Sequence, residues 1–442
     1  MQFNSIAFIF CFLPLFLAVY FIFPSGVRST VLLAGSLLYY SFASSVDYHA
    51  VMMLILCTCG TYAAGFTLNG SYKKVLLTAY LSILAILLGF LKVYSGGAYL
   101  PAGMSFYLFQ LAAYLIEVYR KKVAPQRDIV VFGSRIIMFP KLLSGPLMAP
   151  AALHEEGYGK INFGCVHDGI QLFILGLGLK VILANRVGGL WTQCSITGYA
   201  HISAPAAWLA LTAYAMQLYC DFWGYSLMAA GLGRMLGFEL PRNFDNPYAS
   251  KTVSEFYRRW HMTLGLWFRE YVYIPLGGNR NGVLKTIANF AVVWALTGLW
   301  HGAGGNYLLW AGILFLLIAN EKLWLGKWLK RSHVMCHVYL VFTVLLSWVP
   351  FAIGDWTEMR LFFGRLFGVG TSAINPNDYL RWGSEYVGLL IVGVILATPL
   401  PEKLWMKLRD SLLADILLVV LFWVSVYFIS TAQQDPFLYF QF

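Results

Sequence analysis

The sequence has few charged residues for its length. Only 12% of the 442 residues are Asp, Glu, Lys or Arg, whereas about 25% is usual in soluble globular domains. This shortage excludes a soluble globular protein. Instead, 59% of the residues are hydrophobic and 17% are aromatic, and windows of about 17 to 25 apolar residues, long enough to cross a hydrocarbon core of about 30 Å, recur along the chain. We therefore predict an all-α polytopic membrane protein with about twelve spans.

Several catalytic and metal-binding patterns are also missing. The sequence contains no Gly-x-Ser-x-Gly elbow and no His-Glu-x-x-His pair, which argues against an embedded serine hydrolase or zinc protease. Its seven cysteines show no metal-like spacing, and small buried hydrophobic side chains are their expected role. We therefore expect no metal site.

No internal repeat and no low-complexity linker divides the chain, so we expect one integral membrane domain over residues 1–442. The first apolar run has no Lys or Arg ahead of it and no small-residue cleavage site behind it, which favours a retained span over a signal peptide. The amino-terminal spans are predicted near residues 6–24, 29–44, 48–66, 75–95 and 101–119, and the last span near 411–430.

The net charge of +11 is explained by loops that flank the spans, so we expect no nucleic-acid binding. Cytoplasmic loops of membrane proteins carry an excess of Lys and Arg. The basic segments are 72–74, 120–127, 322–331 and 403–409. With these segments in the cytoplasm, both termini lie outside, and an extracellular tail lies within residues 411–442. The expected location is the plasma (inner) membrane.

Two regions interrupt the series of plain spans. Residues 128–150 include "FPKLLSGPLMAP", where Pro, Gly and Lys break an apolar stretch, and irregular backbone at membrane depth survives only when buried in protein or lining a wet cavity. Residues 236–282 are polar yet rich in aromatic residues, which predicts re-entrant or amphipathic helices at the cytoplasmic face. Asp221 lies in a predicted span, so we expect a partner such as Arg234, Arg242 or a serine.

A basic cluster follows a helix-start signal in the second of these regions. Thr252 and Glu255 have the spacing of a capping box, and the predicted helix carries His261 with Arg258, Arg259 and Arg269 within about three turns. Glu255 is expected to pair with Arg259 four residues later. The cluster fits either a surface helix that binds anionic headgroups or a cationic mouth for an anionic acyl donor.

A second histidine, His301, lies among glycines in "GLWHGAGG", between two predicted spans. Ionisable groups within membrane segments are costly and indicate function by default. The glycines that follow leave room for a substrate, and a neutral imidazole can take the proton of a hydroxyl that attacks a thioester or ester carbonyl. Its neighbours Trp300 and Asn306 are further candidates for substrate contacts. The alternative is a histidine whose hydrogen bonds are satisfied within a helix hairpin.

Several segments together resemble the membrane-bound O-acyltransferases of the alginate O-acetyltransferase type. They run from residue 101 to the end, with the core motifs in 101–320: "PAGMSFYLFQLAAYLIEVYR", "FPKLLSGPLMAP", "YCDFWGYSLMAAGLGRMLGFELPRNFDNPY", "SEFYRRWHMTLGLWFREYVYIPLGGNRNG", "NFAVVWALTGLWHGAGGNYLLWAG" and "PFLYFQF". The first hundred residues match only in general hydropathy.

The resemblance implies a ring of about 11 or 12 membrane helices around a central tunnel. The hydropathy suggests the same number of spans. The resemblance also implies that His301 is the catalytic residue and His261 the family's second histidine. In such proteins a cytoplasmic donor, here expected to be acetyl-CoA, supplies an acyl group that passes through an extracytoplasmic acyltransferase partner protein to an exported polysaccharide. D-alanyl transfer from a carrier protein is an alternative within the same family. From a different class, a transporter or flippase for a lipid-linked glycan would also suit twelve spans.

The carboxyl-terminal tail carries one more candidate, Tyr439. The predicted topology puts its hydroxyl outside, and the resemblance implies that such a terminal aromatic motif carries the acyl group onwards as a tyrosyl ester. The alternative is that Tyr439 and its aromatic neighbours anchor the tail at the membrane interface.

Overall fold

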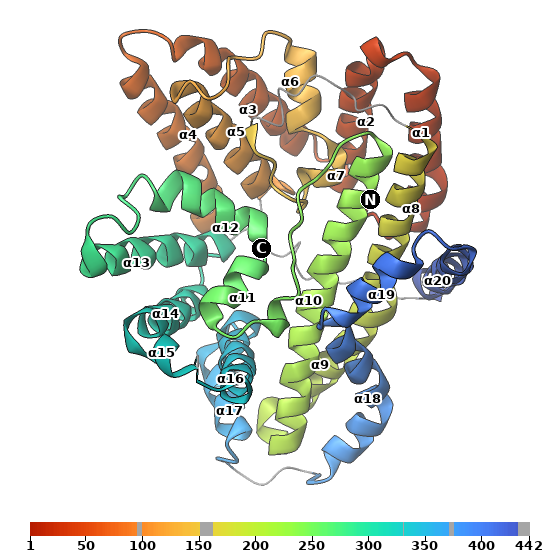
Figure 1. Cartoon of the computed structure of the whole chain (residues 1–442), viewed down its shortest axis with the longest axis vertical. Helices are drawn as coiled ribbons and strands as arrows, with labels where there is room; N and C mark the ends of the chain where they lie inside the picture. The colour runs from red at the N-terminus through yellow and green to blue at the C-terminus, as the bar shows by residue number, and fades with distance from the viewer. Residues whose placement is uncertain (95–99, 151–161, 330, 371–374, 432–442) are drawn as a thin grey trace.

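The computed structural model describes residues 1–94, 100–150, 162–329, 331–370 and 375–431. Within these residues the chain contains helices and no β-strand (Figure 1). The predicted all-α polytopic membrane protein is thereby confirmed. The α-helices are α1 (Leu13–Ile22), α2 (Arg28–Ala43), α3 (Tyr48–Thr67), α4 (Lys73–Tyr94), α5 (Met104–Tyr119), α6 (Ile129–Ile136), α7 (Phe139–Leu142), α8 (Phe163–Gly178), α9 (Asn185–Thr197), α10 (Ala204–Met235), α11 (Val253–Arg259), α12 (Met262–Phe268), α13 (Gly282–His301), α14 (Gly305–Asn320), α15 (Gly326–Leu329), α16 (His333–Ala352), α17 (Trp356–Leu366), α18 (Asp378–Leu396), α19 (Leu400–Leu408) and α20 (Leu412–Thr431).

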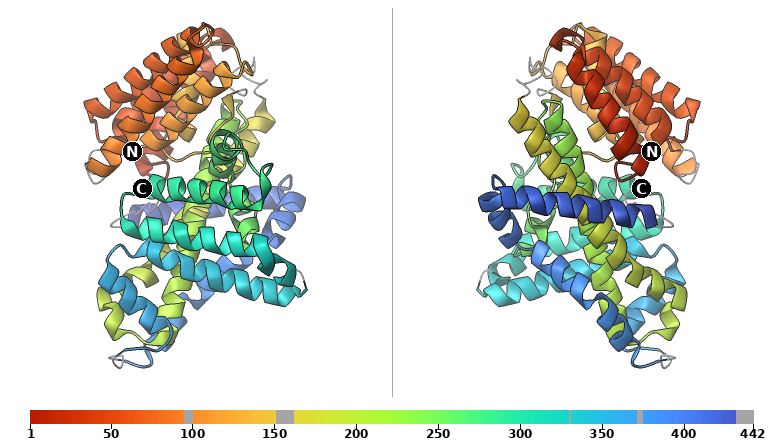
Figure 2. Two further views of the ribbon diagram at one scale, coloured as in Figure 1. Left: turned by 90° about the vertical axis from the view of Figure 1, so that its left-hand side faces the viewer. Right: turned by 90° about the vertical axis from the view of Figure 1, so that its right-hand side faces the viewer.

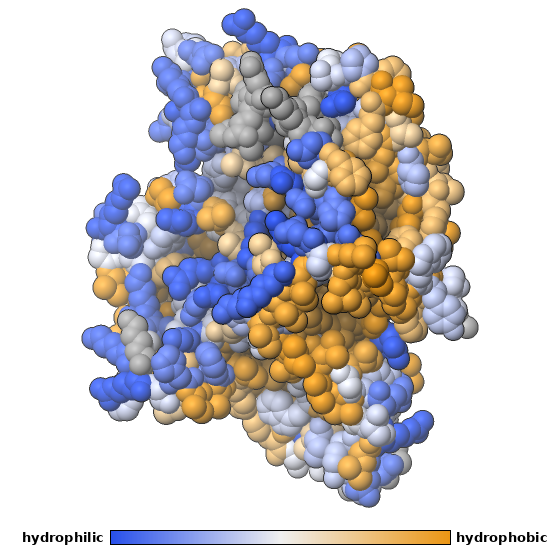
Figure 3. All heavy atoms as spheres, turned by 45° about the vertical axis from the view of Figure 1, so that its right-hand side comes forward, coloured by the Kyte–Doolittle hydropathy of each residue, from blue (hydrophilic) through white to orange (hydrophobic). Residues whose placement is uncertain are grey.

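In the described part of the chain, 8 helical stretches are long and apolar enough to cross a membrane. The predicted span 29–44 forms α2 but is not one of them, and two shorter apolar helices accompany them, Phe8–Ile22 and Met104–Tyr119. The eight stretches are Tyr48–Thr67, Lys73–Val93, Phe163–Thr197, Gly282–His301, Gly305–Leu329, His333–Ala352, Asp378–Leu396 and Leu412–Thr431. Figure 3 shows a broad hydrophobic surface on one side of the molecule, as lipid contact requires.

The helices form an amino-terminal block and a larger remainder built around α10. Figure 1 shows α1 to α6 together at one end, while α8 and α10 run through the middle of the molecule. In Figure 2, α13 and α14 lie side by side and cross the direction of α10. The segment that ends in His301 is therefore placed between the central helix and the edge of the molecule.

Glycines let α8 and α10 approach each other closely. A Cβ added at Gly176 would lie 2.4 Å from the carbonyl oxygen of Gly224, and one added at Gly231 would lie 2.5 Å from that of Gly169. Small residues at such contacts are the common way for membrane helices to pack, because backbones can then touch. The pair forms the rigid centre against which the site helices are placed.

Asp221 is paired, as expected, and its charged partner is Lys180. Lys180 lies in a π-helical turn, η4 (Leu179–Ala184), and its Nζ is 2.7 Å from the Asp221 carboxylate; both side chains are fully buried. Lys180 also donates to the Asn185 side chain at 2.8 Å. Lys180 was not among the partners named from the sequence, because a residue 41 positions earlier becomes a neighbour only when α8 and α10 pack together.

The interrupted segment within residues 128–150 is buried in protein, as irregular backbone requires. Asp128 caps α6 by accepting from Val130 N at 2.8 Å, and residues 132–148 are buried throughout. Leu147 N donates to the Thr263 hydroxyl at 3.1 Å. The segment therefore lies directly against α12, next to His261.

Candidate active site

The two histidines that stand out in the sequence line one cavity. It has a volume of about 690 Å³, and its walls come from α10, α11, α12, α13, α14, α16 and the π-helical turn after α12, η7 (Arg269–Tyr273). Arg258 and Arg269 line it and are exposed, whereas His261 and His301 line it and are buried, with 4% and 6% of their surfaces exposed. The cavity thus leads from two surface cations to two buried imidazoles.

Hydrogen bonds at its amino-terminal end hold α11 in place. The Thr252 hydroxyl accepts from Glu255 N at 3.0 Å, as predicted for the cap, and the Glu255 carboxylate accepts from Lys251 N at 3.0 Å. Glu321, at the end of α14, accepts from Val253 N at 2.6 Å and from Ser254 N at 2.9 Å. A carboxylate on the first amides of a helix is favourable, so α11 is tied to the helix that follows His301.

The predicted single helix of the basic cluster is in fact two short helices that meet at His261. Trp260 is extended, and His261 adopts left-handed backbone angles (φ 47°, ψ 53°) before α12 begins. Asn243 secures this turn, since its carbonyl accepts from Met262 N at 2.9 Å and its side chain accepts from the Thr263 hydroxyl at 2.9 Å. Because of this break, the His261 ring points into the cavity. In a continuous helix the ring would point in another direction.

Aromatic rings surround both imidazoles. The His301 ring centroid lies 4.6 Å from that of Trp300, 4.9 Å from Trp310 and 5.0 Å from Phe351. The His261 ring lies 4.6 Å from the ring of Phe222. Burial lowers the pKa of His261, which lies between two short helices outside the membrane-spanning stretches, to about 3. His261 is therefore neutral at pH 7 and can donate a hydrogen bond from its N–H.

The structure separates the three arginines predicted to form a cationic mouth. Arg258 and Arg269 line the cavity, but Arg259 is not among the lining residues in the described part of the chain. Its guanidinium lies 2.8 Å from the Glu255 carboxylate, the predicted pair, and 3.6 Å from that of Asp245. Arg258 and Arg259 are consecutive residues of α11, and consecutive helical side chains point about 100° apart, so the two face different sides.

Trp300 and Asn306, the other predicted substrate contacts, lie beside His301 in the chain or in its helix hairpin. Neither is among the described residues that line the cavity. The Trp300 ring lies between the histidines, 5.9 Å from His261 and 4.6 Å from His301. Asn306 donates to the carbonyl of Pro350 at 3.0 Å and so joins α14 to α16. Tyr439, the third predicted catalytic residue, lies outside the described residues.

Two supporting residues were not singled out from the sequence. Glu321 anchors α11, and Lys92 on α4 donates a hydrogen bond to the carbonyl of Trp300. The available sequence signals were the positions of Lys92 and Glu321, each near the end of an apolar run. Both look like ordinary span-flanking charges, and only the packing shows that they are buried.

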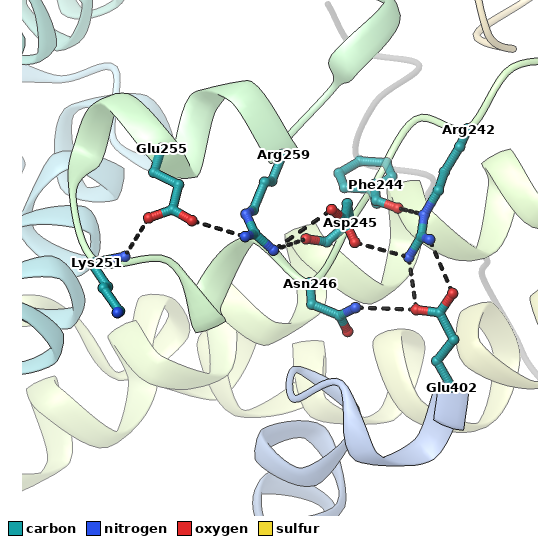
Figure 4. Close-up of polar contacts among 8 residues, drawn as sticks. All are labelled: Arg242, Phe244, Asp245, Asn246, Lys251, Glu255, Arg259 and Glu402. Carbon is teal, nitrogen blue, oxygen red and sulfur yellow. Dashed lines mark hydrogen bonds and ion pairs between the residues drawn. The ribbon is translucent and has the colours of Figure 1, made fainter. Parts of the chain in front are cut away.

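A polar network links the loop before α11 to α19 near the carboxyl-terminal end of the chain (Figure 4). Arg242 donates two hydrogen bonds to the Glu402 carboxylate, at 2.9 Å and 2.8 Å, and Asn246 donates a third at 3.1 Å. Arg242 also lies 3.3 Å from Asp245, which pairs with Arg259. These ion pairs and hydrogen bonds connect α19 to α11, the helix that carries Arg258.

The network predicts a pH-dependent contribution of Glu402 to stability. Burial raises the pKa of Glu402, but the hydrogen bonds from Arg242 and Asn246 outweigh this and lower it below its usual 4.5. A lowered pKa stabilises the fold above about pH 4.5, and this contribution is lost as the pH falls through the folded-state pKa. Because the pair is partly exposed, we expect a small effect. Between pH 6 and pH 3.5, the Tm of the wild-type protein should fall by about 1–2 °C more than the Tm of Glu402→Gln. Thermal unfolding in detergent measures this, and equal losses would contradict it.

The sequence has relatives that are named as acyltransferases. Residues 197–355 match the sequence model of the membrane-bound O-acyltransferase family. The chain is 29% identical to a probable alginate O-acetylase of Pseudomonas putida over 100% of both chains, and 32% identical to that of Pseudomonas fluorescens over 89% of this chain and 81% of the relative. It is also 24% identical to a teichoic acid D-alanyltransferase of Bacillus subtilis, over 52% of this chain and 60% of the relative.

Proposed function

The chain belongs to the membrane-bound O-acyltransferase family and is an acyltransferase, and on this premise we propose that it moves acetyl groups from cytoplasmic acetyl-CoA towards an extracellular polysaccharide. The observation that carries the proposal is the cavity that joins the exposed Arg258 and Arg269 to the buried His261 and His301. Guanidinium groups bind phosphates bidentately. An anionic donor can therefore be held at the surface while its acyl end reaches the imidazoles.

In the proposed reaction His301 acts as the general base. Its neutral ring takes the proton of an acceptor hydroxyl as that oxygen attacks the thioester carbonyl carbon. The carbon–sulfur bond then breaks, the sulfur takes the bonding electron pair, and the protonated ring returns its proton to the thiolate. The products are an oxygen ester and a free thiol. His261 lines the same passage and is proposed as the second catalytic residue, donating a hydrogen bond from its N–H to the carbonyl oxygen as negative charge develops there.

The surroundings of His301 favour a short acyl group. Trp300, Trp310 and Phe351 place ring centroids within 5.0 Å of the imidazole centroid, so bulky side chains already occupy the space on these sides of the ring. A two-carbon acetyl group needs little room beyond the carbonyl. The names of the two alginate O-acetylase relatives agree with this choice.

The wider route is also part of the proposal. We place the protein in the plasma (inner) membrane with both termini outside, on the distribution of basic loops. An extracytoplasmic acyltransferase partner would receive the acyl group and pass it to the exported polysaccharide. Tyr439, in the outer tail, is the proposed intermediate acceptor, because its hydroxyl can form an ester.

D-alanyl transfer is the second candidate, favoured by the similarity to the teichoic acid D-alanyltransferase. The two groups differ in mass and in charge, since an alanyl ester carries a free amine. Mass spectrometry of surface glycans from wild-type cells and from a deletion strain distinguishes them. Loss of acetyl esters on deletion supports the proposal, whereas loss of alanyl esters supports the alternative.

The donor site is tested by comparing arginines that differ in placement. Arg258→Ala and Arg269→Ala should each raise the KM for acetyl-CoA about two- to fivefold, because exposed charge pairs contribute about 0.2–1 kcal/mol, and the double variant should raise it further. The kcat should change little, since the lost pairing is made equally in the ground and transition states. High salt should weaken donor binding in the same direction.

Arg259→Ala is the matched control, because Arg259 is adjacent to Arg258 in sequence but pairs with Glu255 and Asp245 outside the cavity. Its KM should equal that of the wild type even where its thermal stability falls. A double variant with unchanged KM would contradict the donor site, and so would an Arg259→Ala effect as large as that of the double variant.

A further inference from the structure

Lys92 is buried on a helix whose other described residues are exposed or half-buried. In α4, none of the apolar window that qualifies it as a span is buried inside the protein. Of residues 73–93, Lys92 alone is buried, with 7% of its surface exposed. Charged side chains in membrane segments are rare and point to protein or water when they occur. Its burial therefore calls for a specific contact.

That contact is made with the residue before His301. Lys92 Nζ donates a hydrogen bond to the main-chain carbonyl of Trp300, and it lies 5.5 Å from the centroid of the Trp300 ring. Helix α13 ends at His301, so this carbonyl is one of the last four, which have no acceptor role within the helix. A cation at the carboxyl-terminal end of a helix is favourable both as a hydrogen-bond donor and as a charge.

The contact fixes the part of the chain that carries both the imidazole and its neighbouring ring. The Trp300 carbonyl belongs to the peptide bond that leads into His301, and the residues after His301 are small, in "GAGG". Ala303, Gly304 and Gly305 are exposed, so they supply little packing on that side. Lys92 instead holds the peptide from the amino-terminal block, 208 residues away in sequence.

We propose that Lys92 is a positioning residue that holds the Trp300–His301 peptide, and with it the His301 ring, in the geometry needed for acyl transfer. The inference rests on the proposed role of His301 as general base. Small displacements matter for such a role, because a misplacement of about 1 Å can cost on the order of 10²-fold in rate.

The test uses full-length protein in lipid nanodiscs, with acetyl-CoA as the donor probe and water as the acceptor of the acetyl group. The readout is the free thiol that is released together with acetate. Lys92→Met keeps the length and apolar stem but removes the donor and the charge, so kcat should fall about 10- to 100-fold with the donor KM within about twofold. Lys92→Arg keeps both features and should restore most of the lost kcat. Lys74→Met, an exposed lysine of the same helix, should match the wild type.

A second readout does not depend on activity. Diethylpyrocarbonate modifies neutral imidazoles, and mass spectrometry reports the rate at His301 against the partly exposed His167 in the same molecule. Release of the peptide in Lys92→Met should raise the His301 rate by about threefold or more, as local opening exposes buried groups, whereas Lys92→Arg and Lys74→Met should not change it. If Lys92→Met is not recovered folded, Lys92→Gln replaces it, with the same expected losses.

The outcomes separate this inference from the proposed function. An active His301→Ala protein would refute the general base but leave the modification rate as a test of the Lys92 contact. Wild-type kcat and a wild-type modification rate in folded Lys92→Met would overturn the inference, whatever the role of His301. Equal loss of kcat in Lys92→Met and Lys92→Arg, with no change in modification, would also overturn it.

Discussion

Replacing His301 with alanine is expected to abolish nearly all acyl transfer while leaving the amount of folded protein unchanged. A general base contributes about 10²–10⁴-fold, and the His301 ring lines the cavity. Transfer is measured as thiol release from acetyl-CoA in nanodiscs and as acetyl esters on surface glycan in cells. Size-exclusion chromatography and the Tm of the purified variant control for folding.

His301→Gln is the matched variant, because it fills more of the space than alanine and keeps hydrogen-bonding groups but cannot act as a base at pH 7. We expect it to be as inactive as His301→Ala. Retention of more than about a tenth of wild-type activity in either variant would fall outside the range for a general base and would assign His301 a structural role.

Replacing His261 with asparagine is expected to lower transfer about 10²-fold at nearly unchanged stability. The shorter side chain withdraws its N–H from the developing oxyanion, and loss of one such hydrogen bond has an effect of this size. The choice of asparagine follows from the backbone, since His261 has φ 47° and asparagine is among the residues that tolerate left-handed angles. The turn between α11 and α12 should therefore persist without the imidazole. Activity and Tm are measured as for His301.

His261→Ala provides the contrast. It loses the imidazole and also the tolerance for left-handed angles, which cost about 1–2 kcal/mol for an ordinary residue, so its Tm should fall below that of His261→Asn. If His261→Asn keeps wild-type kcat and KM, the buried ring serves only to shape the turn, and the second catalytic role is wrong.

The sequence was sufficient for features that depend on local patterns. Apolar length identified the helical membrane architecture, and Thr252 with Glu255 identified the start of α11, because capping involves residues three apart. It also singled out His301, since an ionisable side chain stands out in apolar surroundings, and His261, which lies in a basic cluster after a helix-start signal. That the two rings line one cavity is a tertiary arrangement, and the structure shows it.

Features that depend on tertiary packing were missed or mistaken. The break at His261 is held by Asn243 and by residues of the buried segment around Leu147. No pattern in the neighbouring sequence predicts this break. The contacts of Lys92 with Trp300, of Lys180 with Asp221 and of Glu321 with Val253 join residues 41 to 208 positions apart, so these contacts could not be read from neighbouring residues.

In the proposed function, one cavity holds the donor between the surface arginines and the buried histidines. A cryo-EM structure of the full-length protein in nanodiscs with a non-hydrolysable thioether analogue of acetyl-CoA tests this directly. We expect density in the cavity, with the phosphates at Arg258 and Arg269 and the acetyl end beside His301. Density for the analogue at another surface, with the cavity filled only by side chains or lipid, would refute the donor site.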